Sequence, residues 1–245
     1  MRVLFGTLAL LAGQALAEQA PLRFAVAESW SMPLVRIEQG VPTEGILYDI
    51  MKSAAEQAGS RAEFRVMARL RTQAAMDQGE VDVRCYTGQS FSPNLSGDFI
   101  WSLPLVRQRD FLVGLPGNPS EPPSGQAPAA HVGTVLGYQY PALQGAFDTQ
   151  ALVRDDARNQ DQVLLKLLVG RYRYAVSNEL TLDWFNSLQP PEQRLSKLRL
   201  LDDQVLGCYV RNDPRLPVQS LLRAFVRMRQ SGELERIFQR YQPGP

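Results

Sequence analysis

Four segments between residues 22 and 86 decide the fold: LRFAVA (22–27), ILYDIMKSAAEQAG (46–59), EFRVM (63–67) and VDVRCY (81–86). In the second segment the apolar residues recur at helical spacing and Gly59 ends the pattern, which predicts a helix. The other three have the length and the apolar or alternating pattern of strands. A short helix, capped by Thr72 and ended by Gly79, precedes the last strand. This order of strand, helix, strand, helix and strand is typical of a parallel sheet with helices on its faces.

The same rhythm restarts in the second half of the chain. After a strand at 111–115, the segment 116–128 is rich in Pro, Gly and Ser, which indicates a surface loop, with a domain linker as the alternative. Further strands are expected at 131–135, 151–154, 173–177, 197–201 and 205–210, the last two separated by Asp202 and Asp203. Helices are expected at 162–169, capped by Asp161, and in two C-terminal segments, 218–228 and 234–241. Two α/β units in succession are consistent with two lobes joined by crossing strands.

The first seventeen residues have the features of a secretory signal. Arg2 supplies a positive charge, residues 3–12 form a short apolar run, and Ala15-Leu16-Ala17 has the small-x-small pattern of a cleavage site. The run is about half of the roughly 20 residues that a membrane span needs. We therefore expect cleavage near Ala17 and release into the periplasm, and no later segment approaches the length of a transmembrane helix.

Charge and composition narrow the classes of function. Without Arg2 the 26 Lys and Arg residues become 25 and balance the 25 Asp and Glu residues, which argues against nucleic acid or an anionic membrane as the main partner. With one histidine, His131, and two cysteines, the sequence has no metal-ligand cluster. It also has no nucleophile elbow, P-loop or dinucleotide fingerprint, so we expect no cofactor and no enzymatic activity. Cys85 and Cys208 lie in strand-like segments, and either a disulfide or two buried small side chains fits them.

Six segments in a fixed order carry a family resemblance: AVAESWSMPL (25–34), GILYDIMKSAAEQAG (45–59), ARLRTQAAMDQGEVDV (68–83), HVGTVLGYQY (131–140), DQVLLKLLVGRYRYAVSNE (161–179) and LGCYVRNDPRLPVQSLLRAFVRMRQSGELERIFQRY (206–241). This order resembles the extracellular solute-binding proteins of family 3, the amino-acid-type receptors of ABC importers. The resemblance covers nearly all of the chain that follows the signal.

The resemblance implies an α/β fold of the type II periplasmic binding protein kind, with two lobes and a ligand cleft between them. Lobe one would comprise 18–107 and 205–245, lobe two 108–204, with hinge crossings near 107–111 and 201–205. Such a protein would capture a small polar solute, an amino acid or a related metabolite, at the carboxyl ends of the strands and close around it by a hinge motion. It would act as a monomer and deliver the solute to an importer permease.

The resemblance also places residues at the cleft, in the order of the chain: Glu28, Ser29, Trp30, Arg69, Tyr86, Thr87, Gly88, Asn94, Gly137, Tyr138, Gln139, Asn178 and Glu179. Gly137 would open a helix whose free N–H groups suit an anion. Each position also has a structural explanation: Trp30 as core, Gly137 as a simple turn, and Glu179 as a solvated surface charge.

Two departures from the family concern the ligand. The arginine that clamps the ligand carboxylate in these receptors is matched by a position near Asn94, and the aspartate that binds the amino group is matched by Asn178. A neutral Asn does not replace a guanidinium fork, so Arg69 or Arg84 is the alternative source of the positive charge.

Two other functions share this fold. One is an accessory or sensory module that passes its bound state to a receptor. The other is a cyclohexadienyl-dehydratase-like enzyme, in which Glu28 or Glu179 would act as general acid after burial raised its pKa.

Overall fold

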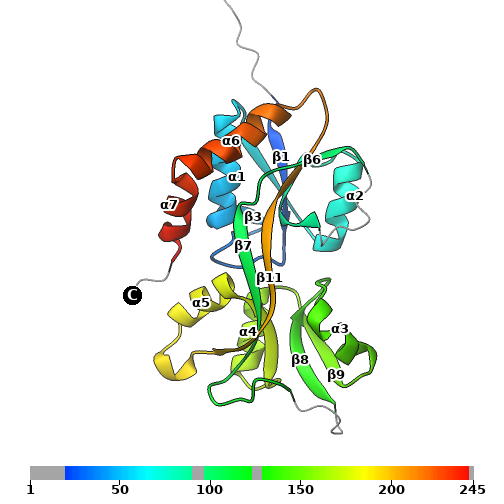
Figure 1. Ribbon diagram of the computed structural model, residues 1–245, viewed down its shortest axis with the longest axis vertical. Helices are drawn as coiled ribbons and strands as arrows, with labels where there is room; N and C mark the ends of the chain where they lie inside the picture. The colour runs from blue at the N-terminus through cyan, green and yellow to red at the C-terminus, as the bar shows by residue number, and fades with distance from the viewer. Residues whose placement is uncertain (1–19, 90–96, 123–128, 243–245) are drawn as a thin grey trace, which may run out of the picture.

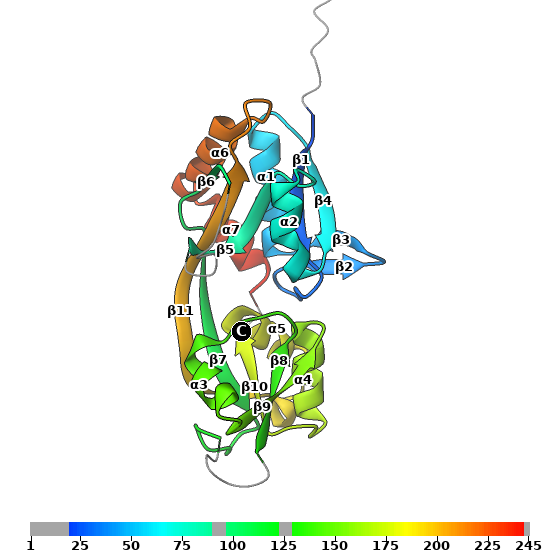
Figure 2. The same ribbon diagram turned by 90° about the vertical axis from the view of Figure 1, so that its right-hand side faces the viewer.

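The first lobe is built on three parallel strands in the order β4-β1-β5 (Figures 1 and 2). The computed structural model describes residues 20–89, 97–122 and 129–242. The strands are β1 (Leu22–Ala27), β4 (Ala62–Met67) and β5 (Val83–Thr87). Helices α1 (Ile46–Gln57) and α2 (Thr72–Asp77) connect them, and α1 buries its apolar stripe. The predicted strand–helix–strand rhythm is therefore present, because each apolar face has a neighbouring element to cover it.

The second lobe repeats this plan. Strands β8 (Ala130–Val135), β9 (Leu152–Ala157) and β10 (Tyr174–Asn178) are parallel in the order β10-β8-β9. Helices α3 (Pro141–Asp148), α4 (Gln160–Leu168) and α5 (Glu179–Ser187) flank them. The predicted α/β class, with two lobes that each hold a mainly parallel sheet and helices, is confirmed; the residue bounds of the lobes stay a prediction.

Two long antiparallel strands run between the lobes in both views, β7 (Val106–Gly114) and β11 (Ser196–Arg211). The expected pair of strands at 197–201 and 205–210 was wrong, because β11 is one strand of 16 residues. Asp202 and Asp203 do not form a turn: β7 pairs with β11 on both sides of them, and a register shift between Leu200 and Asp202 accommodates the irregularity as a bulge.

Several elements were not expected from the sequence. They are the hairpin of β2 (Arg36–Glu38) and β3 (Val41–Glu44), strand β6 (Phe99–Trp101), helix α5, and the 3-10 turns Arg69–Arg71 and Pro191–Gln193. Helix α4 is capped by Asn159, whose side chain accepts the N–H of Gln162 at 2.9 Å, and not by Asp161. Thr72 likewise provides no side-chain cap for α2, because the 3-10 turn runs directly into that helix.

Two C-terminal helices close the first lobe. Helices α6 (Val218–Gln230) and α7 (Glu233–Arg240) pack beside α1, as their apolar spacing predicts (Figure 1). Phe225 and Met228 of α6 are fully buried in the same core cluster as α1. Leu180 and Trp184 of α5, from the second lobe, also pack against this cluster. The two lobes are therefore in direct apolar contact.

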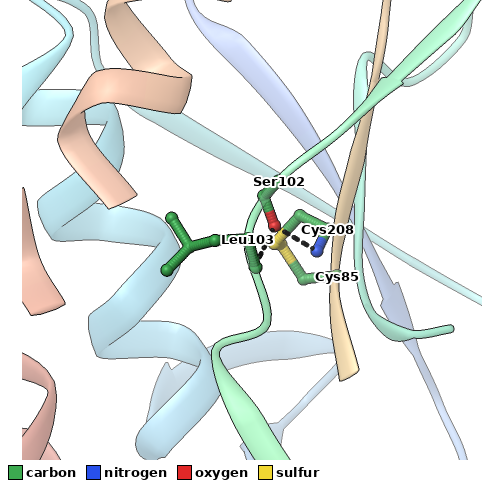
Figure 3. Close-up of a disulfide and its surroundings, with 4 residues drawn as sticks. All are labelled: Cys85, Ser102, Leu103 and Cys208. Carbon is green, nitrogen blue, oxygen red and sulfur yellow. Dashed lines mark hydrogen bonds between the residues drawn. A yellow bond between two sulfur atoms is a disulfide. The ribbon is translucent and has the colours of Figure 1, made fainter. Parts of the chain in front are cut away.

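A disulfide joins Cys85 of β5 to Cys208 of β11, so the cysteines are not two separate buried thiols (Figure 3). The two residues face each other across the antiparallel pair. Next to the bridge, Ser102 Oγ accepts the N–H of Cys208 at 2.9 Å and donates to the carbonyl of Leu103 at 2.7 Å. The bridge fastens the end of β11 to the parallel sheet of the first lobe.

No helix within 20–89, 97–122 or 129–242 is long and apolar enough to cross a membrane. The predicted signal at 1–17 lies outside the described residues.

Candidate ligand-binding site

A small cavity lies between the lobes, where the carboxyl ends of their parallel strands face each other. Its walls come from the loop after β1, the ends of β5 and β10, strand β7, the β8–α3 connection and the first turns of α4 and α5. It is lined by Ser29, Trp30, Ser31, Leu34, Tyr86, Gln108, Asp110, Tyr138, Tyr140, Gln160, Val176, Asn178 and Thr181. Its volume of about 20 Å³ suits a water molecule and is too small for an amino acid. A solute could therefore enter only if the lobes moved apart.

Hydrogen bonds join the two lobes across this cavity. Ser29 Oγ lies 3.1 Å from Tyr138 Oη, and Ser31 Oγ accepts the N–H of Asp161 at 3.2 Å. Both serines are almost fully buried. Beside them, Trp30 meets Tyr86 edge to face with ring centroids 6.0 Å apart. The expectation that the Trp30 loop and the turn at Gly137 face each other is consistent with these contacts.

Two buried hydroxyl groups at the cavity have no hydrogen-bond partner among the residues that the structure describes: Tyr86 Oη and Thr181 Oγ1. Thr181 is fully buried in α5. Tyr86, the second-last residue of β5, has φ +58°, a left-handed conformation that a bulky residue rarely adopts. Burial also raises the pKa of the Tyr86 phenol well above its usual value, so the group is neutral. Unsatisfied buried hydroxyls and strained backbone are costly, and both are common at binding sites.

Asp110 is the one charged side chain that lines the cavity, in so far as the described residues show. It lies on β7, paired with Asn178 of β10 on one side and Asp202 of β11 on the other. One carboxylate oxygen accepts the Gln108 Nε2 hydrogen at 2.8 Å. Burial raises the pKa of Asp110 to about 6, and the charge of Asp202 adds to this effect while the Gln108 bond opposes it.

Of the two arginines that the sequence offered as a source of positive charge, Arg69 contacts a residue of the cavity lining. It lies in the 3-10 turn before α2, and its guanidinium stacks 4.7 Å from the ring centroid of Tyr138. Burial lowers the pKa of Arg69, and it has no ion pair within the described part of the chain. Arg84, the other candidate, instead stacks on Tyr209 at 5.9 Å and donates to its hydroxyl at 3.4 Å. Tyr209 is part of the core of the first lobe.

The thirteen predicted site residues lie in different places relative to the cavity. Five line the cavity: Ser29, Trp30, Tyr86, Tyr138 and Asn178. Arg69 lies against one of them, and Asn94 lies outside the described residues. The others do not line it: Glu28, Thr87, Gly88, Gly137, Gln139 and Glu179. Glu28 is exposed, and Thr87, the residue after Tyr86, is buried. Gln139 lines a smaller hollow that Asp110 also lines.

One local expectation needs correction, and two other predicted residues have structural partners. Gly137 does not open a helix; it occupies a turn with φ +77°, and α3 begins at Pro141. Asn178 caps α5, because its Oδ1 accepts the N–H of Thr181 at 2.9 Å. Glu179 pairs with Arg109 and, at 2.9 Å, with Lys197. Neither Glu28 nor Glu179 lines the cavity, so the carboxyl group placed to act as an acid there is that of Asp110.

Sequence reasoning missed most of the polar lining: Ser31, Gln108, Asp110, Tyr140, Gln160 and Thr181. Asp110 sits in the charged run RQRD, where nothing local distinguishes it from an exposed residue. Tyr140 follows the Gly137 turn, and its hydroxyl accepts the N–H of Val135 at 2.9 Å. The aromatic pair in GYQY was the only available signal for that position.

The chain is similar in fold to amino-acid-binding proteins and to a receptor ligand-binding core of known structure. An ancestral arginine-binding protein bound to arginine superposes with a TM-score of 0.70 at 18% identity, over 90% of this chain and 97% of that one. The GluR0 ligand-binding core from Nostoc punctiforme, in complex with L-glutamate, gives 0.69 at 13% identity, over 90% and 99%. AncCDT-1, an ancestral amino acid-binding protein and precursor of cyclohexadienyl dehydratase, gives 0.68 at 15%, over 91% and 95%.

No protein-family model and no curated protein sequence matches the chain. At identities below 20% the structural likeness is one of fold, and it agrees with the two-lobed architecture seen in Figures 1 and 2.

Proposed function

We propose that this chain is a periplasmic solute-binding protein of the family 3 type, which captures a small polar solute between its lobes for an ABC importer. The observation that carries the proposal is the interlobe cavity, which is lined by Asp110, Tyr86 and Thr181. The hydroxyls of Tyr86 and Thr181 have no hydrogen-bond partner among the described residues. Uncompensated polar groups at such a point are destabilising unless a ligand pairs with them. The mixture of aromatic rings with a few polar groups is also what small-molecule sites contain.

The arrangement of the lobes supports a capture mechanism. Strands β7 and β11 cross between the lobes, and the bulges in β11 give this pair places to bend. Hinge motion on the two strands would break the Ser29–Tyr138 and Ser31–Asp161 contacts and admit a solute. The same solute would then replace these contacts by its own when the lobes close.

The partner protein and the compartment belong to the proposal as well. A cleaved signal at 1–17 would deliver the chain to the periplasm, where a permease would accept the closed, loaded monomer. A sensory or accessory role uses the same site with a different partner. A dependence of solute uptake on both this chain and a permease would favour the importer, and binding without such a dependence would favour the sensory role.

A ligand screen by thermal unfolding tests the proposal. We expect one class among amino acids, organic acids, polyamines and sugars to raise the melting temperature in a saturable way. A ligand at 100 times its Kd should add about 2.7 kcal/mol to the free energy of unfolding. Absence of stabilisation by every class would count against a solute-binding role.

The variant Thr181→Val tests whether the solute binds in the cavity. The Thr181 hydroxyl is buried without a partner among the described residues. Its removal should therefore raise the free energy of unfolding by about 1 kcal/mol and weaken the affinity for the solute by about tenfold. Thr134→Val is the matched control: Thr134 is equally buried in the second lobe but donates to Asp156 at 2.6 Å. This control should lose stability and keep its affinity. Equal affinities in all three proteins would place the solute elsewhere.

A dehydratase-like enzyme is the second candidate, favoured by one observation. A carboxyl group with a pKa near 6, as in Asp110, is suited to donate a proton to a leaving hydroxyl group. Formation of aromatic product when the purified protein is incubated with prephenate or arogenate would support the enzyme over the receptor.

A further inference from the structure

We propose that the solute is a small organic cation, a protonated amine, and that its ammonium group binds to Asp110 of the hinge strand β7. This inference rests on the proposed function and names the class of solute. It departs from α-amino-acid recognition, in which a carboxylate-binding arginine and an amino-binding aspartate at the positions of Asn94 and Asn178 would hold the ligand.

The described lining of the cavity carries a negative charge. Among the described residues, Asp110 is the sole charged group in the lining, and one of its two oxygens already accepts a hydrogen from Gln108. The other oxygen has no hydrogen bond within the described segments of the chain. Asp110 is half-buried, and a half-buried carboxylate that lacks a cation is unfavourable. A ligand that supplies the cation relieves this cost.

The side chains around Asp110 are mainly aromatic. Four aromatic side chains complete the lining around Asp110, namely Trp30, Tyr86, Tyr138 and Tyr140. Aromatic faces attract cations, and several rings with a carboxylate form the usual environment of an alkylammonium group. The hydroxyls of Tyr86 and Thr181, which lack partners, are able to accept the remaining N–H hydrogens of such a group.

Arg69 lies against a lining residue but is not itself part of the described lining. Its guanidinium stacks on Tyr138 at 4.7 Å but does not line the cavity, so none of the described residues places a cation there to hold a carboxylate. A ligand carboxylate next to Asp110 would meet repulsion in a buried setting. The cavity therefore favours an amine over an organic acid.

Binding should then depend on pH in a defined direction. The titratable groups that face Asp110 are Asp202 of β11, Tyr86 at the end of β5, and Tyr138 and Tyr140 of the β8–α3 connection. The tyrosines are neutral, because burial raises the pKa of each of them. Since a cation requires the ionised carboxylate and the pKa of free Asp110 is about 6, affinity should be constant above about pH 7 and fall as the pH decreases through 6.

The test measures Kd by calorimetry for propylammonium, putrescine and agmatine, with 1-propanol and propionate as the neutral and anionic analogues. At least one amine should bind, and the analogues should bind at least 100 times more weakly. From pH 7.5 to pH 5 the Kd of the amine should rise about tenfold. Asp110→Asn should raise Kd at pH 7.5 by about 100-fold and abolish the pH dependence.

Asp202→Asn is the matched control, because it removes a neighbouring charge that does not line the cavity. It should change Kd at pH 7.5 less than threefold and move the midpoint of the pH profile to lower pH, since a like charge beside Asp110 is lost. The melting temperature of Asp110→Asn at pH 7.5 should equal or exceed that of the wild type, which separates a loss of binding from a loss of folding.

Two outcomes would overturn the inference. One is preferential binding of propionate or of a neutral solute; the other is an Asp110→Asn variant that binds the amine with unchanged affinity and pH dependence. Either result would leave a solute-binding protein in place, whereas absence of binding by every class in the wider screen would contradict the proposed function itself.

Discussion

Replacing both bridged cysteines, Cys85→Ala with Cys208→Ala, should lower the free energy of unfolding by about 4 kcal/mol. The bridge closes a loop across a sequence separation of 123 residues, and the loss of loop-closure entropy in the unfolded chain grows with that length. Both cysteines are buried, so alanine also leaves a small void. Chemical denaturation at pH 7 measures the change, and the melting temperature should fall by about 10 °C.

The control for this prediction is the response to a reducing agent. Dithiothreitol should destabilise the wild-type protein toward the level of the double variant and leave that variant unaffected. A difference of less than 1 kcal/mol between the oxidised wild type and the variant would show that β5 and β11 hold together without the bridge.

The second large effect concerns Asp82, which is fully buried at the start of β5. Its carboxylate accepts three hydrogen bonds from Arg23, including the backbone N–H at 3.0 Å, and one from Arg211 at 3.0 Å. Asp82→Asn keeps the shape but removes the charge that pairs with both guanidinium groups, whose side chains are only 30% and 20% exposed. Arg211 keeps its ion pair with Asp213 at 3.3 Å, whereas Arg23 loses its ion pair with Asp82. We expect a loss of about 3 kcal/mol in the free energy of unfolding, at the lower end for broken buried ion pairs because both arginines reach water.

Glu80→Gln is the comparison for this variant. Glu80 lies two residues away and pairs with Arg71 on the surface at 3.9 Å, so its loss should cost less than about 0.5 kcal/mol. Equal effects of the two substitutions in urea denaturation would mean that the buried network around Asp82 contributes no more than a surface pair.

Much of the fold could be predicted from local patterns. The parallel units were visible because their helices and strands have strong apolar periodicity, as in α1 and α6. The continuity of β11 was not visible, because Asp202 and Asp203 have the composition of a turn and only their pairing with β7 keeps them in the strand. Helix α3 has Pro141 at its first position but also an interior glycine, Gly145, which weakens the pattern.

The site was less predictable, for a physical reason. Trp30, Tyr86 and Tyr138 lie at or just after the carboxyl ends of strands, where ligands meet α/β sheets, and the sequence indicated them. Asp110 is half-buried because segments far apart in the sequence pack against each other around β7. Thr181 lies inside a helix, and its unpartnered hydroxyl depends on tertiary packing. No local pattern in the sequence carries either fact.

Hydrogen–deuterium exchange with the most stabilising solute tests the central claim most directly, that a solute binds between the lobes. At saturation, amide exchange should slow together at residues 29–34 of the first lobe and at residues 136–140 and 176–181 of the second, because the solute closes all three segments around it. Protection confined to one lobe, or to segments that do not line the interlobe cavity, would contradict the claim.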